Sequence, residues 1–133
     1  MREIYRVNKN YYAVKCDIKK FFYSIDKNIL YNILSKYIND QKILDFSKLI
    51  LDDGMSKGIP IGNYTSQYFA NIYLNELDHY AKDVLRCKYY IRYMDDFIVL
   101  VKSKKRAKEV YLLLEDFVKD IVLKVDIFYV IME

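Results

Sequence analysis

Two adjacent carboxylates, Asp95 and Asp96, separate two short runs that resemble β-strands, residues 88–93 and 97–102. Both runs are rich in β-branched and aromatic residues, which favour a pleated, half-buried surface. Carboxylates at the tip of an apolar hairpin repel each other, and an apolar setting disfavours both ionised forms. A bound divalent cation would reverse this penalty, whereas a solvated turn would need no cation, since Asp is common in turns. The hairpin tip is therefore either a cation site or a solvated turn.

The composition indicates one globular domain. The 133 residues are 53% hydrophobic and 30% charged, which allows a packed core and excludes a disordered chain. A net charge of +4 is compatible with a nucleic-acid partner but does not require one. Cys16 and Cys87 lack metal-type spacing, so we expect buried free thiols in a reducing compartment. No signal peptide or membrane-length apolar run is visible, which predicts a cytoplasmic protein without a membrane partner.

Hydrophobic spacing predicts the order of strands and helices. Residues 11–17, 88–93, 97–102 and 122–132 are predicted strands. Helices are predicted from a cap at Ser24 or Asp26, over residues 41–51, from Asn63 or Tyr64 to Arg86, and after Ser103. All three glycines and the single proline fall within residues 54–62, where the backbone is freest to adopt unusual dihedral angles.

This order predicts an α+β fold of the split βαβ type, βαββαβ, with an antiparallel sheet backed by helices, as in ferredoxin-like and RRM domains. In that plan the first and second strands run parallel, with the third strand between them. The end of the first strand then lies at the same edge as the hairpin turn. Asp17, Asp95 and Asp96 should therefore converge at one edge of the sheet.

Convergent carboxylates suit hard cations. Mg²⁺ takes one or two protein carboxylates together with substrate phosphates, and a set of Asp residues can hold two such ions ~4 Å apart for in-line phosphoryl transfer. That chemistry needs no nucleophilic Ser or Cys. His79, the only histidine, falls within the long predicted helix and is expected to be structural or exposed.

Three blocks, in order along the chain, carry a family resemblance. Tyr93-Met94-Asp95-Asp96 resembles the palm hairpin of reverse transcriptases, in which an aromatic and a variable residue precede two Asp. Asp17-Ile18-Lys19-Lys20-Phe21-Phe22 resembles the first palm motif of the same family. Gly58-Ile59-Pro60-Ile61-Gly62-Asn63-Tyr64-Thr65-Ser66-Gln67 resembles the motif that lines the nucleotide pocket and opens a helix. The resemblance extends from about Tyr11 to Lys102.

The resemblance implies an RNA-directed DNA polymerase palm that uses two Mg²⁺ ions, or Mn²⁺ as a substitute. The implied partners are an RNA template, a DNA primer and dNTPs. The implied catalytic acids are Asp17, Asp95 and Asp96, with the carbonyl of Ile18 completing a metal site. Phe22 would be the steric gate against a 2′-hydroxyl, while Phe21 is expected in the core. The other implied contacts are nucleotide-binding Pro60, Ile61, Gly62 and Gln67, and primer- or template-binding Tyr93 and Met94.

The second block also suggests a subtype. Many reverse transcriptases have Gln-Gly where this chain has Ile61-Gly62. The form Ile61-Gly62 followed by Ser66-Gln67 is similar to enzymes of diversity-generating retroelements, with group II intron and retron enzymes as close alternatives. Replacing a polar side chain with Ile61 removes a hydrogen bond that could restrain the nucleotide, which leads us to expect reduced fidelity.

Other parts of the family pattern have no counterpart. No fingers-like basic segment precedes Asp17, no thumb follows, and Lys124 is a weak match for a lysine that could act as a general acid. We therefore expect residues 1–133 to form a single palm domain, a fragment that would use an accessory protein or further segments. The basic run Lys102, Lys104, Lys105, Arg106 and Lys108 is expected to be solvated rather than phosphate-binding. Two alternatives stay open: a two-metal nuclease or cyclase-type palm, and a catalytically incomplete palm that only binds nucleic acid or protein.

Overall fold

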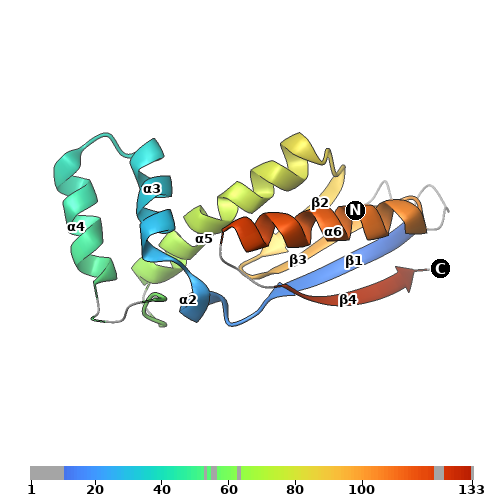
Figure 1. Ribbon diagram of the computed structural model, residues 1–133, viewed down its shortest axis with the longest axis horizontal. Coiled ribbons are helices and arrows are strands. Elements are labelled where there is room, and N and C mark those ends of the chain that lie inside the picture. The colour runs from blue at the N-terminus through green and yellow to red at the C-terminus, as the bar shows by residue number, and fades with distance from the viewer. Residues whose placement is uncertain (1–10, 53, 55–56, 63, 122–124, 133) are drawn as a thin grey trace.

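The computed structural model describes residues 11–52, 54, 57–62, 64–121 and 125–132. Its elements follow the predicted order (Figure 1). The strands are β1 (Tyr11–Ile18), β2 (Tyr89–Tyr93), β3 (Asp96–Val101) and β4 (Val125–Met132). The helices are α2 (Phe21–Ser24), α3 (Lys27–Tyr37), α4 (Gln41–Leu51), α5 (Tyr64–His79), the π-helical turn η1 (Tyr80–Val84) and α6 (Lys104–Asp120).

The four strands form one sheet in the order β2-β3-β1-β4, and each neighbouring pair is antiparallel. Strands β1 and β2 therefore run parallel on either side of β3. Helices α5 and α6 lie across one face of this sheet, and α3 and α4 stand beyond the end at which β1 leaves it (Figure 1). The predicted split βαβ architecture is confirmed.

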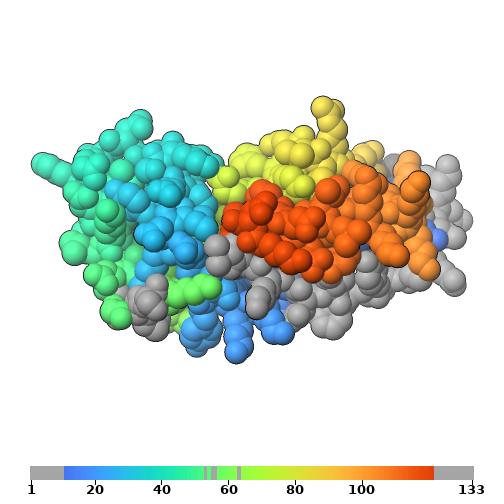
Figure 2. Space-filling model, viewed as in Figure 1, coloured from blue at the N-terminus to red at the C-terminus, as the bar shows by residue number. Residues whose placement is uncertain are grey.

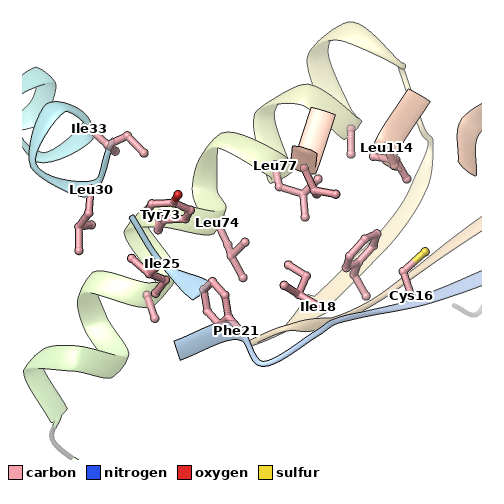
Figure 3. Packing of buried hydrophobic residues seen from close by; sticks show 14 of the residues in the cluster. Cys16, Ile18, Phe21, Ile25, Leu30, Ile33, Tyr73, Leu74, Leu77 and Leu114 are labelled. Atoms are coloured by element: carbon pink, nitrogen blue, oxygen red, sulfur yellow. The ribbon is translucent and has the colours of Figure 1, made fainter. Parts of the chain in front are cut away.

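Alternation along the central strands builds the core. Val14, Cys16 and Ile18 of β1 are almost fully buried, while Lys15 between them is exposed. On β3 the same face carries Phe97 and its buried neighbours Val99 and Val101. Burying each such side chain stabilises the fold by roughly 1.5–3 kcal/mol. Ile18, Leu74, Leu77 and Leu114 meet in this layer between sheet and helices (Figure 3).

Aspartate caps start the paired helices α3 and α4. The carboxylate of Asp26 accepts hydrogen bonds from the backbone N–H groups of Asn28 and Ile29, at 2.9 and 3.0 Å. Asp40 does the same for α4, at 2.8 Å to the N–H of Lys42. These bonds satisfy donors that a helix start otherwise leaves open. Of the two predicted caps, Asp26 is therefore the one that starts α3, and the bounds predicted for α4 are confirmed.

The long predicted helix changes character before Arg86. Regular α5 ends at His79, and η1 follows, in which the N–H of Leu85 donates to the carbonyl of Tyr80 at 2.9 Å. Arg86 has a φ of 53°, a left-handed value that stops the helix. The Nη2 of Arg106 donates to the carbonyl of Leu85 at 2.7 Å. Ala81 and Leu85 are both buried in and after this widened turn. An α-helix would bury residues at the same spacing, so a hydrophobic pattern alone does not distinguish a π-helical turn from an α-helical one.

The two cysteines and the lysines of the basic run lie as the sequence predicts. Cys16 and Cys87 are free and buried, as predicted. Lys102, Lys104, Lys105 and Lys108 are exposed, as expected, whereas Arg106 donates a hydrogen bond to Leu85 and forms an ion pair with Glu109.

Asn63 and the first residues of the last predicted strand, 122–124, lie outside the described residues, as does the weak candidate Lys124. Among the helices of the described ranges, none has both the length and the apolar character needed to span a membrane.

Candidate active site

The C-terminal end of β1 and the β2–β3 turn meet at one sheet edge. Asp17 of β1 lies opposite Asp96 of β3 in the strand register, and Tyr93 of β2 lies opposite the same Asp96. One residue further on, the backbone N–H of Ile18 donates to the carbonyl oxygen of Asp95 at 3.1 Å. The structure therefore brings the three acids to one edge. It corrects one detail, since Asp96 is the first residue of β3 and the turn itself is Met94–Asp95.

Strand alternation sets the face on which the acids stand. Cys16 and Phe97, which neighbour Asp17 and Asp96 along their strands, are buried toward α5 and α6. Successive side chains of a strand point to opposite faces, so Asp17 and Asp96 point to the face that these helices leave uncovered. Asp17 and Asp95 are half-buried and Asp96 is exposed. A ligand can therefore approach the carboxylates of Asp17 and Asp96 without displacing the core.

The turn is held in a costly conformation. Met94 has a φ of 53°, a region that costs a residue with a side chain roughly 1–2 kcal/mol. The Nη1 of Arg92 donates to the carbonyl of Met94 at 2.9 Å, and the Nδ2 of Asn71 lies 3.5 Å from its sulfur. Tyr93 is 80% exposed, whereas Met94 is half-buried. The ring of Tyr93 is thus open to a ligand beside the acids.

The glycine-containing block packs directly on the first block. The N–H of Gly58 donates to the carbonyl of Ile25, and the N–H of Ile59 donates to the carbonyl of Phe22, both at 2.9 Å. Gly58 has a φ of +86°, and a Cβ there would lie 2.9 Å from the carbonyl oxygen of Phe22. Only glycine allows this approach, which joins two segments that are distant in sequence.

The predicted nucleotide residues differ in their surroundings. Phe21 is buried in the core, and Phe22, whose ring centroid lies 5.5 Å from that of Phe21, is half-buried. Pro60 is half-buried, whereas Ile61, Gly62 and Gln67 are exposed on the loop and on the first turns of α5. A Cβ at Gly62 would meet nothing within 4 Å. The side of the block that faces away from Phe22 is therefore open to solvent.

The three acids, all among the described residues, supply oxygen ligands but do not form a preformed metal cage. Within the described part of the chain, no three His, Cys, Asp or Glu side chains form a group able to hold a metal ion. Mg²⁺ commonly keeps several waters and takes only one or two carboxylates, with substrate phosphates supplying other oxygens. Asp17, Asp95 and Asp96 offer oxygen ligands of this kind. His79 is exposed, and its Nδ1 lies 3.0 Å from a carboxylate oxygen of Asp83. Its partner is thus Asp83 and not one of the three acids.

A polar cluster behind the turn was not predicted from the sequence. The Nε and Nη2 of Arg92 donate to the two carboxylate oxygens of Asp78 on α5, each at 2.7 Å. The hydroxyl of Tyr90 donates to Asp78 at 2.7 Å, and burial together with this bond raises the pKa of Tyr90. Burial alone would lower the pKa of Arg92, but its bonds to Asp78 outweigh that effect and raise the pKa. The sequence contains one indication of this cluster, which is that Arg92 lies at a strand position facing the helices.

Comparison with known proteins places this arrangement in a family. The family model described as reverse transcriptase (RNA-dependent DNA polymerase) matches residues 1–127. A Saccharomyces cerevisiae protein described as a COX1/OXI3 intron 2 protein is 31% identical over 90 residues, which cover 56% of this chain and 10% of that protein.

A solved structure shows the same fold. Apo telomerase from Candida tropicalis, truncated from its C-terminal domain, matches with a TM-score of 0.71 at 14% identity, over 98% of this chain and 33% of the telomerase chain. The sequence thus spans a tenth of the curated relative and a third of the structural one. Because the family model matches nearly the whole chain, the chain belongs to the reverse transcriptase (RNA-dependent DNA polymerase) family.

Proposed function

We propose that this chain is the palm of an RNA-directed DNA polymerase, and that Asp17, Asp95 and Asp96 are its catalytic acids. The observation that supports this most directly is the register of the sheet edge. Asp17 lies opposite Asp96, and the Ile18 N–H bonds to the Asp95 carbonyl. Acids from separate strands are thereby fixed relative to one another by backbone hydrogen bonds, which preorganises them for charge stabilisation.

In this proposal the carboxylates of Asp17, Asp95 and Asp96, with the carbonyl of Ile18, hold Mg²⁺, for which Mn²⁺ can substitute. The bound metal would lower the charge on the triphosphate and favour ionisation of the attacking 3′-hydroxyl. Phe22 of α2, the helix that follows β1, would exclude a 2′-hydroxyl. Pro60, Ile61, Gly62 and Gln67 would border the nucleotide, and Tyr93 and Met94 the primer end. The substrates are an RNA template, a DNA primer and dNTPs.

Primer extension on an RNA template tests this function. We expect Mg²⁺-dependent extension that the double change Asp95→Ala/Asp96→Ala abolishes, with a loss of at least about 10³-fold. EDTA should stop extension, and added Mn²⁺ should restore part of it. The matched control is Asp120→Ala, which removes an exposed carboxylate from the end of α6 and should leave extension unchanged. Equal extension by the double variant and the wild type would refute the catalytic assignment.

A second candidate is a catalytically incomplete palm that only binds nucleic acid or a protein partner. The observation behind it is that the chain spans a tenth of the yeast protein and a third of the telomerase chain. Positioning supplies most of the catalysis in phosphoryl transfer, so a palm without neighbouring segments could bind metal and still fail to polymerise. No extension by the isolated chain, but extension when flanking segments are restored, would identify a fragment of a polymerase. No extension in either case would favour this second candidate.

The subtype is a finer proposal. Ile61-Gly62 and Ser66-Gln67 support an enzyme of the diversity-generating retroelement type. The match to an intron-encoded yeast protein keeps the group II intron type as the main rival, with the retron type behind it. Enzymes of diversity-generating retroelements copy their template with errors at adenines. Sequencing of cDNA made on a template of known sequence is therefore the test, and errors concentrated at template adenines would support this type. Errors spread evenly over the four bases would count against it.

A further inference from the structure

The guanidinium of Arg92 makes several hydrogen bonds behind the turn that carries the acids. It donates to both carboxylate oxygens of Asp78 at 2.7 Å, to Oδ1 of Asn71 at 3.0 Å and to the carbonyl of Met94 at 2.9 Å. Its side chain is only 10% exposed. One planar cation thus connects two positions of α5 to the backbone of the turn, a geometry that the rigid fork of arginine permits and lysine does not.

This cluster lies on the opposite side of the sheet from the acids. Tyr90 and Arg92 contact Asp78 on α5, so both side chains point toward the helices. Asp96 points to the uncovered face, as the burial of neighbouring Phe97 shows. The side chains of Arg92 and Asp96 therefore lie on opposite faces of the sheet. The role of Arg92 has to act through the backbone of the turn.

The turn needs such support. Met94 has a left-handed φ of 53°, and strained residues persist where surrounding contacts over-determine them. On one side the Met94 carbonyl is held by Arg92, and on the other the Asp95 carbonyl accepts the N–H of Ile18. The Met94 carbonyl is thus held by Arg92 of β2, which is itself bonded to α5, and the Asp95 carbonyl is held by β1. Loss of either hydrogen bond would let Asp95 and Asp96 move relative to Asp17.

We propose that Arg92 is a positioning residue for the catalytic turn. By linking Asp78 of α5 to the Met94 carbonyl, it sets where Asp95 and Asp96 stand relative to Asp17. This inference rests on the proposed polymerase function for its consequence in catalysis. The structural link itself can be tested without any reaction.

Amide hydrogen exchange, followed by NMR, tests the link. The Ile18 N–H reports whether the turn stays docked on β1, and the Val99 amide in the middle of β3 serves as the reference for general opening. In Arg92→Met, which keeps the length and apolar stem of the side chain, the Ile18 amide should exchange at least about tenfold faster relative to that reference. Equal acceleration at both amides, or none at Ile18, would overturn the proposal.

One further variant distinguishes the effect of the planar guanidinium of Arg92 from the effect of its positive charge, and another serves as the control. Arg92→Lys keeps a cation beside Asp78 and so preserves the fold, but it cannot reach Asp78, Asn71 and Met94 together. Ile18 exchange should therefore stay fast in Arg92→Lys, and full recovery of its protection would overturn the proposal. Arg106→Met is the matched control, because Arg106 also donates to a backbone carbonyl, that of Leu85, beside a different turn. It should leave Ile18 exchange at the wild-type rate.

The catalytic consequence is a separate measurement. In primer extension, Arg92→Lys should lower kcat at least about tenfold while the KM for dNTP changes little, since the group acts on the acids and not on the nucleotide. An unchanged kcat alongside faster Ile18 exchange would overturn the positioning role. If the wild-type chain does not extend primers, the proposed function fails, and the exchange experiment still decides whether Arg92 holds the turn.

Discussion

A Cβ placed on Gly58 would lie 2.9 Å from the carbonyl oxygen of Phe22. Next to this contact, the N–H of Ile59 donates to the same carbonyl, also at 2.9 Å. The approach of two backbones therefore depends on the absence of a side chain at position 58. It also makes the glycine-containing block and the end of the first block one structural unit at the edge where the acids stand.

Two glycines with the same backbone angle allow this contact to be measured. Gly58 and Gly62 both have a φ of +86°, but only Gly58 has atoms near its missing Cβ. Gly62→Ala should cost roughly 1–2 kcal/mol through backbone strain alone. Gly58→Ala should cost about 1–3 kcal/mol more, because the Phe22 and Tyr23 backbones must shift. Urea unfolding of both variants checks this, and equal losses would contradict the steric explanation.

Substitutions at the neighbouring residues Phe21 and Phe22 should affect different properties, stability at Phe21 and nucleotide selection at Phe22. Phe21 is 2% exposed, so Phe21→Ala should destabilise the chain by roughly 3–5 kcal/mol. Phe22 is half-buried beside the proposed site, so Phe22→Ala should cost less stability and raise ribonucleotide incorporation about tenfold or more. Competition between a dNTP and its matching rNTP in primer extension measures this. Unchanged discrimination by a folded Phe22→Ala protein would remove the gate assignment.

Fidelity should depend on the side chain at position 61. Ile61 is 59% exposed and offers no hydrogen bond to a nucleotide. Ile61→Gln would add one, and because a hydrogen bond contributes about 0.5–1.5 kcal/mol, misincorporation should fall about two- to tenfold. Ile61→Leu is the control, since it changes shape without adding a polar group. Steady-state misincorporation rates measure the effect, and identical error rates for all three proteins would count against it.

Alkaline pH should destabilise the fold through Cys16. Burial raises the pKa of this thiol from 9.0 to about 12. An unfolded chain loses the thiol proton near pH 9 while the folded chain keeps it, so stability is fully present below pH 9 and is lost as pH rises toward 12. The stability advantage of the wild type over Cys16→Ala should therefore narrow above pH 9, by up to about 1.4 kcal/mol per pH unit. Urea unfolding at several pH values checks this. A constant difference from pH 8 to pH 11 would be inconsistent with a buried neutral thiol.

Element order and the convergence of the acids were predictable because they follow from local signals. Alternation, caps such as Asp26 and the position of Asp17 at a strand end determine which edge of a split βαβ sheet receives the acids. The turn at Tyr80–Val84 was not predictable, because π-helical and α-helical turns bury apolar residues at similar spacing. The Arg92–Asp78 pair was missed for a different reason. It joins a strand to a helix, and no local pattern specifies a partner across the fold.

The register between Asp17 and Asp96 limits how this family member can change length. Insertion of a single residue within β1 or β3 would turn one acid toward the helices, onto the layer now filled by Cys16 and Phe97. Insertion of two residues would return it to the uncovered face but displace it along the strand by about 7 Å. Natural variation in length is therefore expected in the connections between elements, and the strands that carry the acids should keep their residue count.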